Sequence, residues 1–260
     1  MNTPVVPLKT LMVDALTVQI YESPAAVALA GSVMASKILR QAVEGRGRAN
    51  AIFATGRSQV EFLSHLTHPN NTLPWSHITG FHLDEYLGIA AAHPASFRYY
   101  LAKHLTSKVS FSQWHGIEGD ATQPLAVCEN YAHLLHNHPA DLCCLGVGNN
   151  GHLAFNDPDV ADFGDPHTVK LVRLDEKNRQ QQVDSGNFNT LATVPQYAYT
   201  LTLPAIQQAE NILCFVYGKG KTNIVHRMLN GPIDKHCPAS LLRTTHQSIV
   251  LLDKAAAAQL

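Results

Sequence analysis

The 260-residue chain is predicted to fold as an α/β structure with three layers, in which an open, mostly parallel, Rossmann-like sheet carries helices on both faces. Two observations predict this fold class. Short apolar segments alternate with longer segments of helical periodicity, as in parallel sheets. Several of the apolar segments, such as ILCFVY at 212–217, have no polar face, which indicates strands buried on both sides. No linker or composition break divides the chain, so residues 1–260 are expected to form one domain.

The elements follow from the same periodicities. The expected strands are residues 51–54, 78–83, 141–147, 168–172, 197–201, 212–217 and 248–252. The expected helices are residues 24–43, 60–66, 94–101, 125–135 and a segment after Lys221 that ends at Leu229. Pro94 suits the first turn of its helix, and residues 203–208 are expected to form a turn.

Composition limits the classes of function. The net charge is −1, so the chain lacks the basic surface of a nucleic-acid-binding protein, and an anionic ligand would need a local group of cations. The five cysteines include no C-x-x-C pair, and three of them lie in apolar runs, so we expect free thiols and a reducing compartment, the cytoplasm. The first residues lack the pattern of a secretory signal, and no segment is expected to be apolar over the length of a bilayer.

Ligands of open α/β sheets bind at the carboxyl ends of the strands, so the residues just after each strand are the candidates. After the first expected strand come Thr55, Gly56, Arg57 and Ser58, whose backbone N–H groups at a helix start suit a phosphate. Gly218-Lys219-Gly220-Lys221 offers a second such turn. An ordinary helix cap would also explain the first turn, and a solvated helix start would explain the second nearly as well.

Two carboxylates, Asp84 and Glu85, come directly after the strand at 78–83. One interpretation is a polar turn or a helix cap. The other is a general base at the sheet edge, where partial burial can tune its pKa.

The most specific segment is GVGNNGHLAFNDP at 146–158. Its glycines, including Gly148, allow close approach of the backbone to a ligand. Asn150 and Asp157 flank His152, and an imidazole held by a neighbouring side chain is typical of a proton shuttle near neutral pH. The G-x-G-x-x-G pattern follows a middle strand, which argues against a dinucleotide site.

HLDEYLGIAAAHPASF (82–97) and LGVGNNGHLAFNDP (145–158) resemble the two signature segments of the glucosamine-6-phosphate deaminase family, and the resemblance extends from residue 55 to PASLL at 238–242. The related 6-phosphogluconolactonases share the G-x-G-x-x-G-H core but continue toward a Ser-rich segment. The stretch from Tyr199 to PASLL is also similar to galactosamine-6-phosphate isomerases, so the sugar epimer stays open.

The resemblance implies a role for each candidate. Asp84 would move a proton between C2 and C1 of the open-chain sugar, and His152 would open the pyranose ring. Asn150 and Asp157 would orient His152. The phosphate-binding or substrate-binding residues would be Thr55, Gly56, Arg57, Ser58, Glu85, Gly148 and Lys221. The ligand would be a sugar phosphate, with no metal or organic cofactor and with no nucleic-acid or membrane partner. A homo-oligomer is left open.

Three departures from the family pattern bear on these roles. Asn150 replaces an Asp, so His152 should be less basic, and Asp157 replaces the longer Glu. The lid-like segment VDSGNFN (183–189) lacks the Arg of the family, and Arg57 is expected to supply that charge in preference to Arg179. The serines of the family's allosteric site are also missing from DPDVADF (157–163), so activation by an N-acetylated sugar phosphate is not expected.

Three other functions compete with deamination. The first is 6-phosphogluconolactone hydrolysis, for which Asp84 would be incidental. The second is a sugar-phosphate sensor, which would normally accompany a DNA-binding domain that this chain lacks. The third is a degenerate isomerase-like protein, which Asn150 and the changed lid segment would allow, or a related sugar-phosphate enzyme of different specificity.

Overall fold

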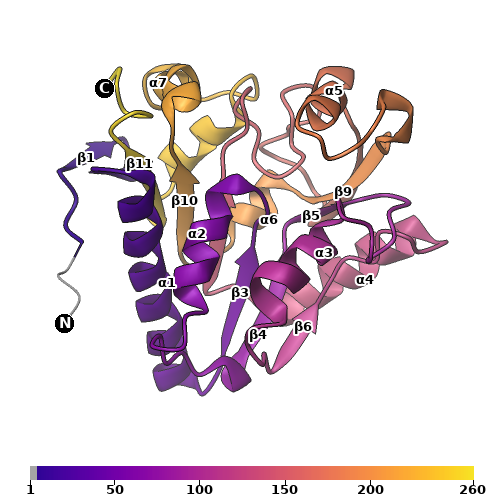
Figure 1. The fold of residues 1–260 in the computed structure, drawn as a ribbon, viewed down its shortest axis with the longest axis horizontal. Coiled ribbons are helices and arrows are strands. Elements are labelled where there is room, and N and C mark those ends of the chain that lie inside the picture. Colours follow the sequence, from indigo (N-terminus) through magenta and orange to yellow (C-terminus); the bar gives the residue numbers. More distant parts are fainter. Residues whose placement is uncertain (1–4) are drawn as a thin grey trace.

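The computed structural model describes residues 5–260 (Figure 1). Its centre is an eight-stranded sheet with the order β1-β2-β11-β10-β7-β3-β4-β6. All neighbouring strands are parallel except β1 and β2, an antiparallel pair at one edge. The strands are β1 (Lys9–Val13), β2 (Leu16–Tyr21), β3 (Ala49–Phe53), β4 (Ile78–His82), β6 (Gln113–His115), β7 (Leu142–Gly146), β10 (Ile212–Val216) and β11 (Ser248–Asp253).

The central strands are buried on both faces. In β10, Leu213 and Phe215 pack into one core and Cys214 into another, because successive side chains of a strand point to opposite faces. The first core includes α1 (Pro24–Arg46) and α2 (Arg57–Leu66). The second includes residues of α4 (Pro124–Asn137), α6 (Leu203–Gln207) and α7 (Thr222–Asn230). The predicted three-layer α/β fold is therefore confirmed, and all five cysteines are buried and unpaired.

A second, smaller sheet of three antiparallel strands was not predicted. It has the order β5-β9-β8 and consists of β5 (Asp84–Tyr86), β9 (Tyr197–Leu201) and β8 (Val169–Arg173). Leu83 alone separates β4 from β5. Its N–H donates to Phe53 O of the central sheet at 3.3 Å, and its carbonyl accepts from Leu201 N of the small sheet at 2.9 Å. The pair at 84–85 is thus strand rather than turn.

The remaining helical elements have between three and nine residues. They are η1 (Trp75–His77), α3 (Phe97–Leu101), its π-helical continuation η2 (Ala102–Thr106), α5 (Glu176–Asp184), η3 (Leu191–Thr193), η4 (Lys219–Lys221) and η5 (Pro238–Thr244). Figure 1 shows α5 and α7 beyond the end of the sheet toward which β3 and β10 point.

Several boundaries differ from the sequence prediction. The helix expected from Pro94 begins at Phe97, because Ser96 caps it by accepting from Tyr99 N at 3.4 Å. The helix expected from residue 60 begins at Arg57, and residues 203–207, expected as part of a turn, form helix α6.

Besides β5 and α6, the strands and α-helices that were not predicted are β1, β2, β6 and α5. The hairpin strand β1 is an edge strand with a mostly exposed pattern, and β6 has only three residues. Helix α5 has no buried residue, so it carries no apolar periodicity to recognise.

The expectation about membrane segments was too strict. Within residues 5–260, α1 is the one helix long and apolar enough to cross a membrane by length and composition. Its buried residues, from Val27 to Leu39, pack in the core on one face of the central sheet. A core helix passes the same test of hydropathy, and the packing accounts for the apolar residues of α1.

Candidate active site

A cavity of about 700 Å³ opens at the carboxyl ends of β3, β7 and β10. The central sheet contributes one side of it, and residues of the small sheet and of α5 contribute the other. The structure brings most of the predicted site residues to this cavity: Thr55, Gly56, Arg57, Ser58, Asp84, Gly148, His152 and Lys221. Asn150 and Asp157 instead line an adjacent cavity of about 400 Å³.

The turn at residues 55–58 joins β3 to α2. Gly56 has φ 104°, a conformation that only glycine adopts without strain. No side chain caps α2, so the first N–H groups of the helix are open to the cavity that Gly56, Arg57 and Ser58 line. Unpaired N–H groups and the positive end of the helix dipole together form an anion site.

Two tyrosines that also line the cavity bind this turn. The Tyr100 hydroxyl donates to Gly56 O at 2.8 Å, and the Tyr217 hydroxyl donates to Arg57 O at 2.9 Å. Burial raises the pKa of both tyrosines above the ordinary value, so both remain hydrogen-bond donors at neutral pH. These two hydrogen bonds fix the orientation of the peptide groups at the start of α2.

Cationic side chains from three elements line the cavity: Arg57 of α2, Arg179 of α5 and Lys221 of η4. Lys221 Nζ donates to Val147 O at 2.8 Å and to Asn149 Oδ1 at 2.7 Å, which leaves a third N–H for a ligand. Burial lowers the pKa of Lys221. Arg57 is exposed where it lines the cavity. Arg179 also lines the cavity, but its Nη2 donates to two carbonyls of the same segment, Leu191 O at 2.7 Å and Val194 O at 2.9 Å.

Asp84 and Glu85 have different environments although they are adjacent. Asp84 lines the cavity and is 8% exposed. Burial, with a further contribution from the Glu85 carboxylate, raises the pKa of Asp84 well above its ordinary value. Such a shift brings a carboxylate toward the range in which general bases work near neutral pH.

The structure does not bring Glu85 to the cavity, where the resemblance would place it as a substrate-binding residue. Glu85 is fully buried, and its carboxylate accepts from the Ser96 hydroxyl at 2.7 Å and from Phe97 N and Arg98 N at 3.0 Å. The Arg98 guanidinium lies 3.4 Å from it. Glu85 therefore fixes the start of α3, as a helix cap.

His152 sits directly over Gly148. A methyl group at position 148 would overlap the imidazole ring, so only glycine leaves room for the ring. His152 N donates to Asn150 Oδ1 at 3.1 Å, which shapes the turn before the imidazole. The ring is partly buried and lines the cavity, with Nδ1 turned to Asp157 Oδ1 at 2.9 Å.

Asp157 is the centre of a small polar cluster. Its Oδ1 accepts from Asn150 Nδ2 at 2.8 Å and from Asn178 Nδ2 at 2.6 Å, besides the contact with His152. Burial opposes the charge of Asp157, but the hydrogen bonds from these three side chains outweigh it and lower the pKa of this carboxyl. Asp157 is thus an anion at neutral pH, and it favours the tautomer of His152 with the proton on Nδ1 and a free Nε2.

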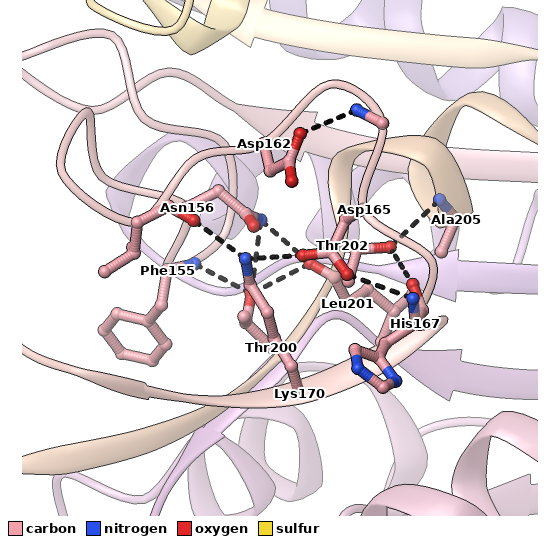
Figure 2. Close-up of polar contacts among 12 residues, drawn as sticks. Phe155, Asn156, Asp162, Asp165, His167, Lys170, Thr200, Leu201, Thr202 and Ala205 are labelled. Carbon is pink, nitrogen blue, oxygen red and sulfur yellow. Dashed lines mark hydrogen bonds and ion pairs between the residues drawn. The ribbon is translucent and has the colours of Figure 1, made fainter.

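The loop that carries these residues is fastened to the small sheet (Figure 2). Asn156 is fully buried, and its Nδ2 donates to Leu153 O at 2.9 Å and to Leu201 O at 2.8 Å. Phe155 N donates to Thr200 Oγ1 at 3.1 Å. These bonds hold the loop on β9 just after His152, so the position of the imidazole depends on the small sheet.

Further along, an ion pair between Lys170 Nζ and Asp165 Oδ2 at 2.7 Å fastens the chain to β8 (Figure 2).

No group of three or more His, Cys, Asp and Glu side chains in residues 5–260 could hold a metal ion. The site offers an anion cradle, a base and an imidazole, which is the equipment for proton transfer on an anionic substrate.

Sequence reasoning missed Asn178, Tyr100 and Tyr217. Asn178 lies on a helix with no apolar signal, and the two tyrosines lie 44 and 160 residues from the carbonyls that they bind. No local pattern could indicate such contacts.

Comparison with known proteins gives a consistent result. The model of the family described as glucosamine-6-phosphate isomerases/6-phosphogluconolactonase matches residues 22–251. The glucosamine-6-phosphate deaminase of Listeria monocytogenes is 33% identical over 233 residues, which cover 89% of this chain and 96% of that protein. That of Streptococcus pyogenes is 30% identical and covers 88% of this chain and 95% of that protein.

Solved structures agree with the fold. The structure of a monomeric glucosamine-6-phosphate deaminase matches with a TM-score of 0.85 at 26% identity and covers 94% of this chain and 99% of that one. A 6-phosphogluconolactonase from Shewanella baltica matches with a TM-score of 0.75 at 19% identity and covers 94% and 100%, a likeness of fold alone.

Proposed function

Because the chain belongs to the family of glucosamine-6-phosphate isomerases and 6-phosphogluconolactonases, we propose that it converts glucosamine 6-phosphate and water to fructose 6-phosphate and ammonia. The observation that carries the proposal is Asp84, a buried carboxylate with a raised pKa in the same cavity as His152 and the open start of α2. Proton transfer between neighbouring carbons needs one such base on one face of the sugar.

The reaction divides among these residues. The 55–58 turn and Lys221 hold the phosphate, and this binding keeps the reacting carbons against Asp84. His152 accepts the proton of O1 through Nε2 and returns one to O5, which opens the ring. Asp84 then takes the proton from C2 while the aldehyde oxygen O1 takes one from the protonated amino group, which gives an enolamine. Asp84 delivers its proton to C1, which leaves a hydroxyl group on C1 and an iminium group at C2. Water adds to C2 and ammonia leaves, so that a ketone remains.

The closest competing function is hydrolysis of 6-phosphogluconolactone. That reaction moves no proton at C2, so it would give Asp84 no role and no reason for burial. Galactosamine 6-phosphate differs from glucosamine 6-phosphate only at C4, away from the carbons on which Asp84 acts. The epimer is therefore decided by measurement, with glucosamine 6-phosphate expected as the better substrate.

The test is an assay of ammonia release from glucosamine 6-phosphate and galactosamine 6-phosphate, beside lactone hydrolysis, for the wild type and Asp84→Asn. We expect ammonia release in the wild type and a loss of about 10²–10⁴-fold in the variant, the usual effect of removing a general base. Inorganic phosphate should still bind to the variant. Turnover of Asp84→Asn within tenfold of the wild type would contradict the proposal.

We also propose that the enzyme acts in the cytoplasm, in the breakdown of amino sugars such as N-acetylglucosamine after the acetyl group has been removed. The five buried, unpaired cysteines support a reducing compartment.

A further inference from the structure

We infer that Asn178 of α5 is a positioning residue that sets the basicity of His152 through Asp157; the inference rests on the role proposed above for His152. The carboxylate that holds the imidazole is shared. His152 Nδ1, Asn150 Nδ2 and Asn178 Nδ2 all lie within 2.6–2.9 Å of the same oxygen, Asp157 Oδ1. The contact from Asn178 is the shortest of the three, and it comes from a different element.

The sharing of one oxygen limits what Asp157 can do for His152. An anion stabilises a neighbouring imidazolium and raises the pKa of the imidazole. Each amide that donates to Asp157 Oδ1 stabilises the carboxylate by itself and weakens its pull on the proton of Nδ1. Two amide donors therefore leave Asp157 with a weaker pull on the Nδ1 proton than an otherwise unpaired carboxylate would have, which suits an imidazole that must both accept and release a proton.

The hydrogen bonds from the two amides respond differently to a movement of α5. Asn150 lies in the same loop as His152 and moves with it. Asn178 lies on α5, a helix of the cavity wall that has no buried residue. A displacement of α5 removes the bond to Asp157 and leaves the imidazole more basic. The position of α5 over the cavity is thereby coupled to the protonation of His152.

Other charged groups also face this cluster. On the cavity side they are Arg57 from α2, Asp84 from β5, Arg179 from α5 and Lys221 from η4. On the side of the second cavity they are Asp159, Asp175 and Lys177. None of them is altered by a substitution at position 178, so a change in the pKa of His152 in such a variant measures the contribution of Asn178.

The experiment is an NMR titration of His152 in the full-length protein, with its resonance assigned by comparison with His152→Gln. In Asn178→Ala the pKa of His152 should rise by about half a unit, the effect of one hydrogen bond to a charged group shared between two partners. In Asn178→Asp, which keeps the shape but replaces the donor by a second carboxylate, the rise should be larger. Gln180→Ala removes an exposed amide of the same helix that bonds only to Asp184, and it should leave the pKa unchanged.

An unchanged pKa of His152 in both Asn178 variants, or the same rise in Gln180→Ala, would overturn the inference. The pH profile of kcat/KM for ammonia release should move to higher pH with the pKa of His152, and a simple loss of structure would not move it in this way. The titration requires no turnover. A protein that releases no ammonia but shows the ordered rise would refute the proposed reaction and leave the coupling, whereas ammonia release without the rise would refute the coupling alone.

Discussion

At the scale of single residues, Leu83 determines the environment of Asp84. It carries the chain from the end of β4 into β5, bonded on one side to the central sheet and on the other to the small sheet. Asp84 follows at the seam between the sheets, where its side chain lines the cavity but is shielded from bulk water. The neighbouring Glu85 has a structural role instead, because its carboxylate accepts hydrogen bonds from residues at the start of α3.

This environment predicts the pH dependence of activity. Asp84 must be ionised to accept a proton, and its pKa is raised well above the ordinary value by burial and by Glu85. Activity should therefore be lost as the pH falls through that raised pKa, so the acidic limb of kcat/KM should lie above the usual range of a carboxylate, about 4. A pH profile in glucosamine 6-phosphate measures it.

The raised pKa of Asp84 also affects the stability of the fold. A folded-state pKa above the unfolded value means that the ionised carboxylate destabilises the fold at neutral pH. Asp84→Asn removes that charge, so its melting temperature at pH 7 should equal or exceed that of the wild type. A clearly lower melting temperature, or an acidic limb at the pKa of an ordinary carboxylate, would argue against a buried base.

We expect Arg57 to supply the positive charge that the segment at 183–189 lacks. Its side chain lines the cavity beside the open start of α2, whereas Arg179 is held by carbonyls of its own segment. Arg57→Ala should raise KM for glucosamine 6-phosphate about ten- to hundredfold, as expected when a charged hydrogen bond to phosphate is lost. A double-mutant cycle that crosses Arg57→Ala with glucosamine, the substrate without phosphate, measures the contact. Additive effects would mean that Arg57 does not touch the phosphate.

At the scale of elements, the turn between β3 and α2 depends on two other elements for its shape. Tyr100 belongs to α3, just before the π-helical turn η2, and Tyr217 follows β10. Their hydroxyl groups bind two consecutive carbonyls, Gly56 O and Arg57 O. The turn can therefore present its N–H groups without paying for reorganisation when an anion arrives.

Tyr100→Phe and Tyr217→Phe test this role. Each change removes one hydrogen bond and should weaken the inhibition by inorganic phosphate about two- to tenfold, with a larger effect in the double variant. Tyr99→Phe is a matched control, because Tyr99 neighbours Tyr100 but is 40% exposed and does not line the cavity. The same phosphate affinity in the double variant as in the wild type would show that the turn needs no support from the tyrosines.

The elements also show what the sequence could predict. Strands β3, β4, β7, β10 and β11 of the central sheet were recognisable, because each contains an apolar run that is almost entirely buried. The residues after these strands were recognisable as a site for the same reason, since parallel strands end at one edge. Helix α5 was not, because it is polar on all sides, and with it Asn178 was missed.

At the scale of the whole molecule, the cavity lies between two sheets of different construction, and only one of them could be predicted. The small sheet pairs β5 with β9, two segments more than a hundred residues apart in the chain. Strand-like patterns at 168–172 and 197–201 indicated the strands but not their partners, since an apolar run does not reveal which edge it joins. Asp84 and His152 were therefore predicted as site residues, whereas the small sheet on one side of their cavity was not.

The difference in packing between the central sheet and α5 predicts that stability is uneven across the molecule. The core strands β3, β7 and β10 lie between two layers of helices, whereas α5 buries no residue and is held by single contacts such as Asn178 with Asp157 and Arg179 with Leu191 and Val194. Amides of α5 should therefore exchange with solvent through local opening, and those of the core strands only through global unfolding. Hydrogen exchange followed by mass spectrometry of the native protein measures both.

Ligand binding provides a second test of the difference in stability between α5 and the core strands. If α5 closes over a phosphate-containing substrate, a saturating concentration of fructose 6-phosphate, the proposed product, should slow exchange in α5 and leave β7 and β10 nearly unchanged. Asn178→Ala should raise the rate of exchange in α5 without ligand, because it removes one of the few contacts of that helix, and Gln180→Ala should have a smaller effect. Protection of α5 equal to that of β10 in the unliganded protein would mean that contacts beyond those described hold the helix, and that it does not open independently of the core.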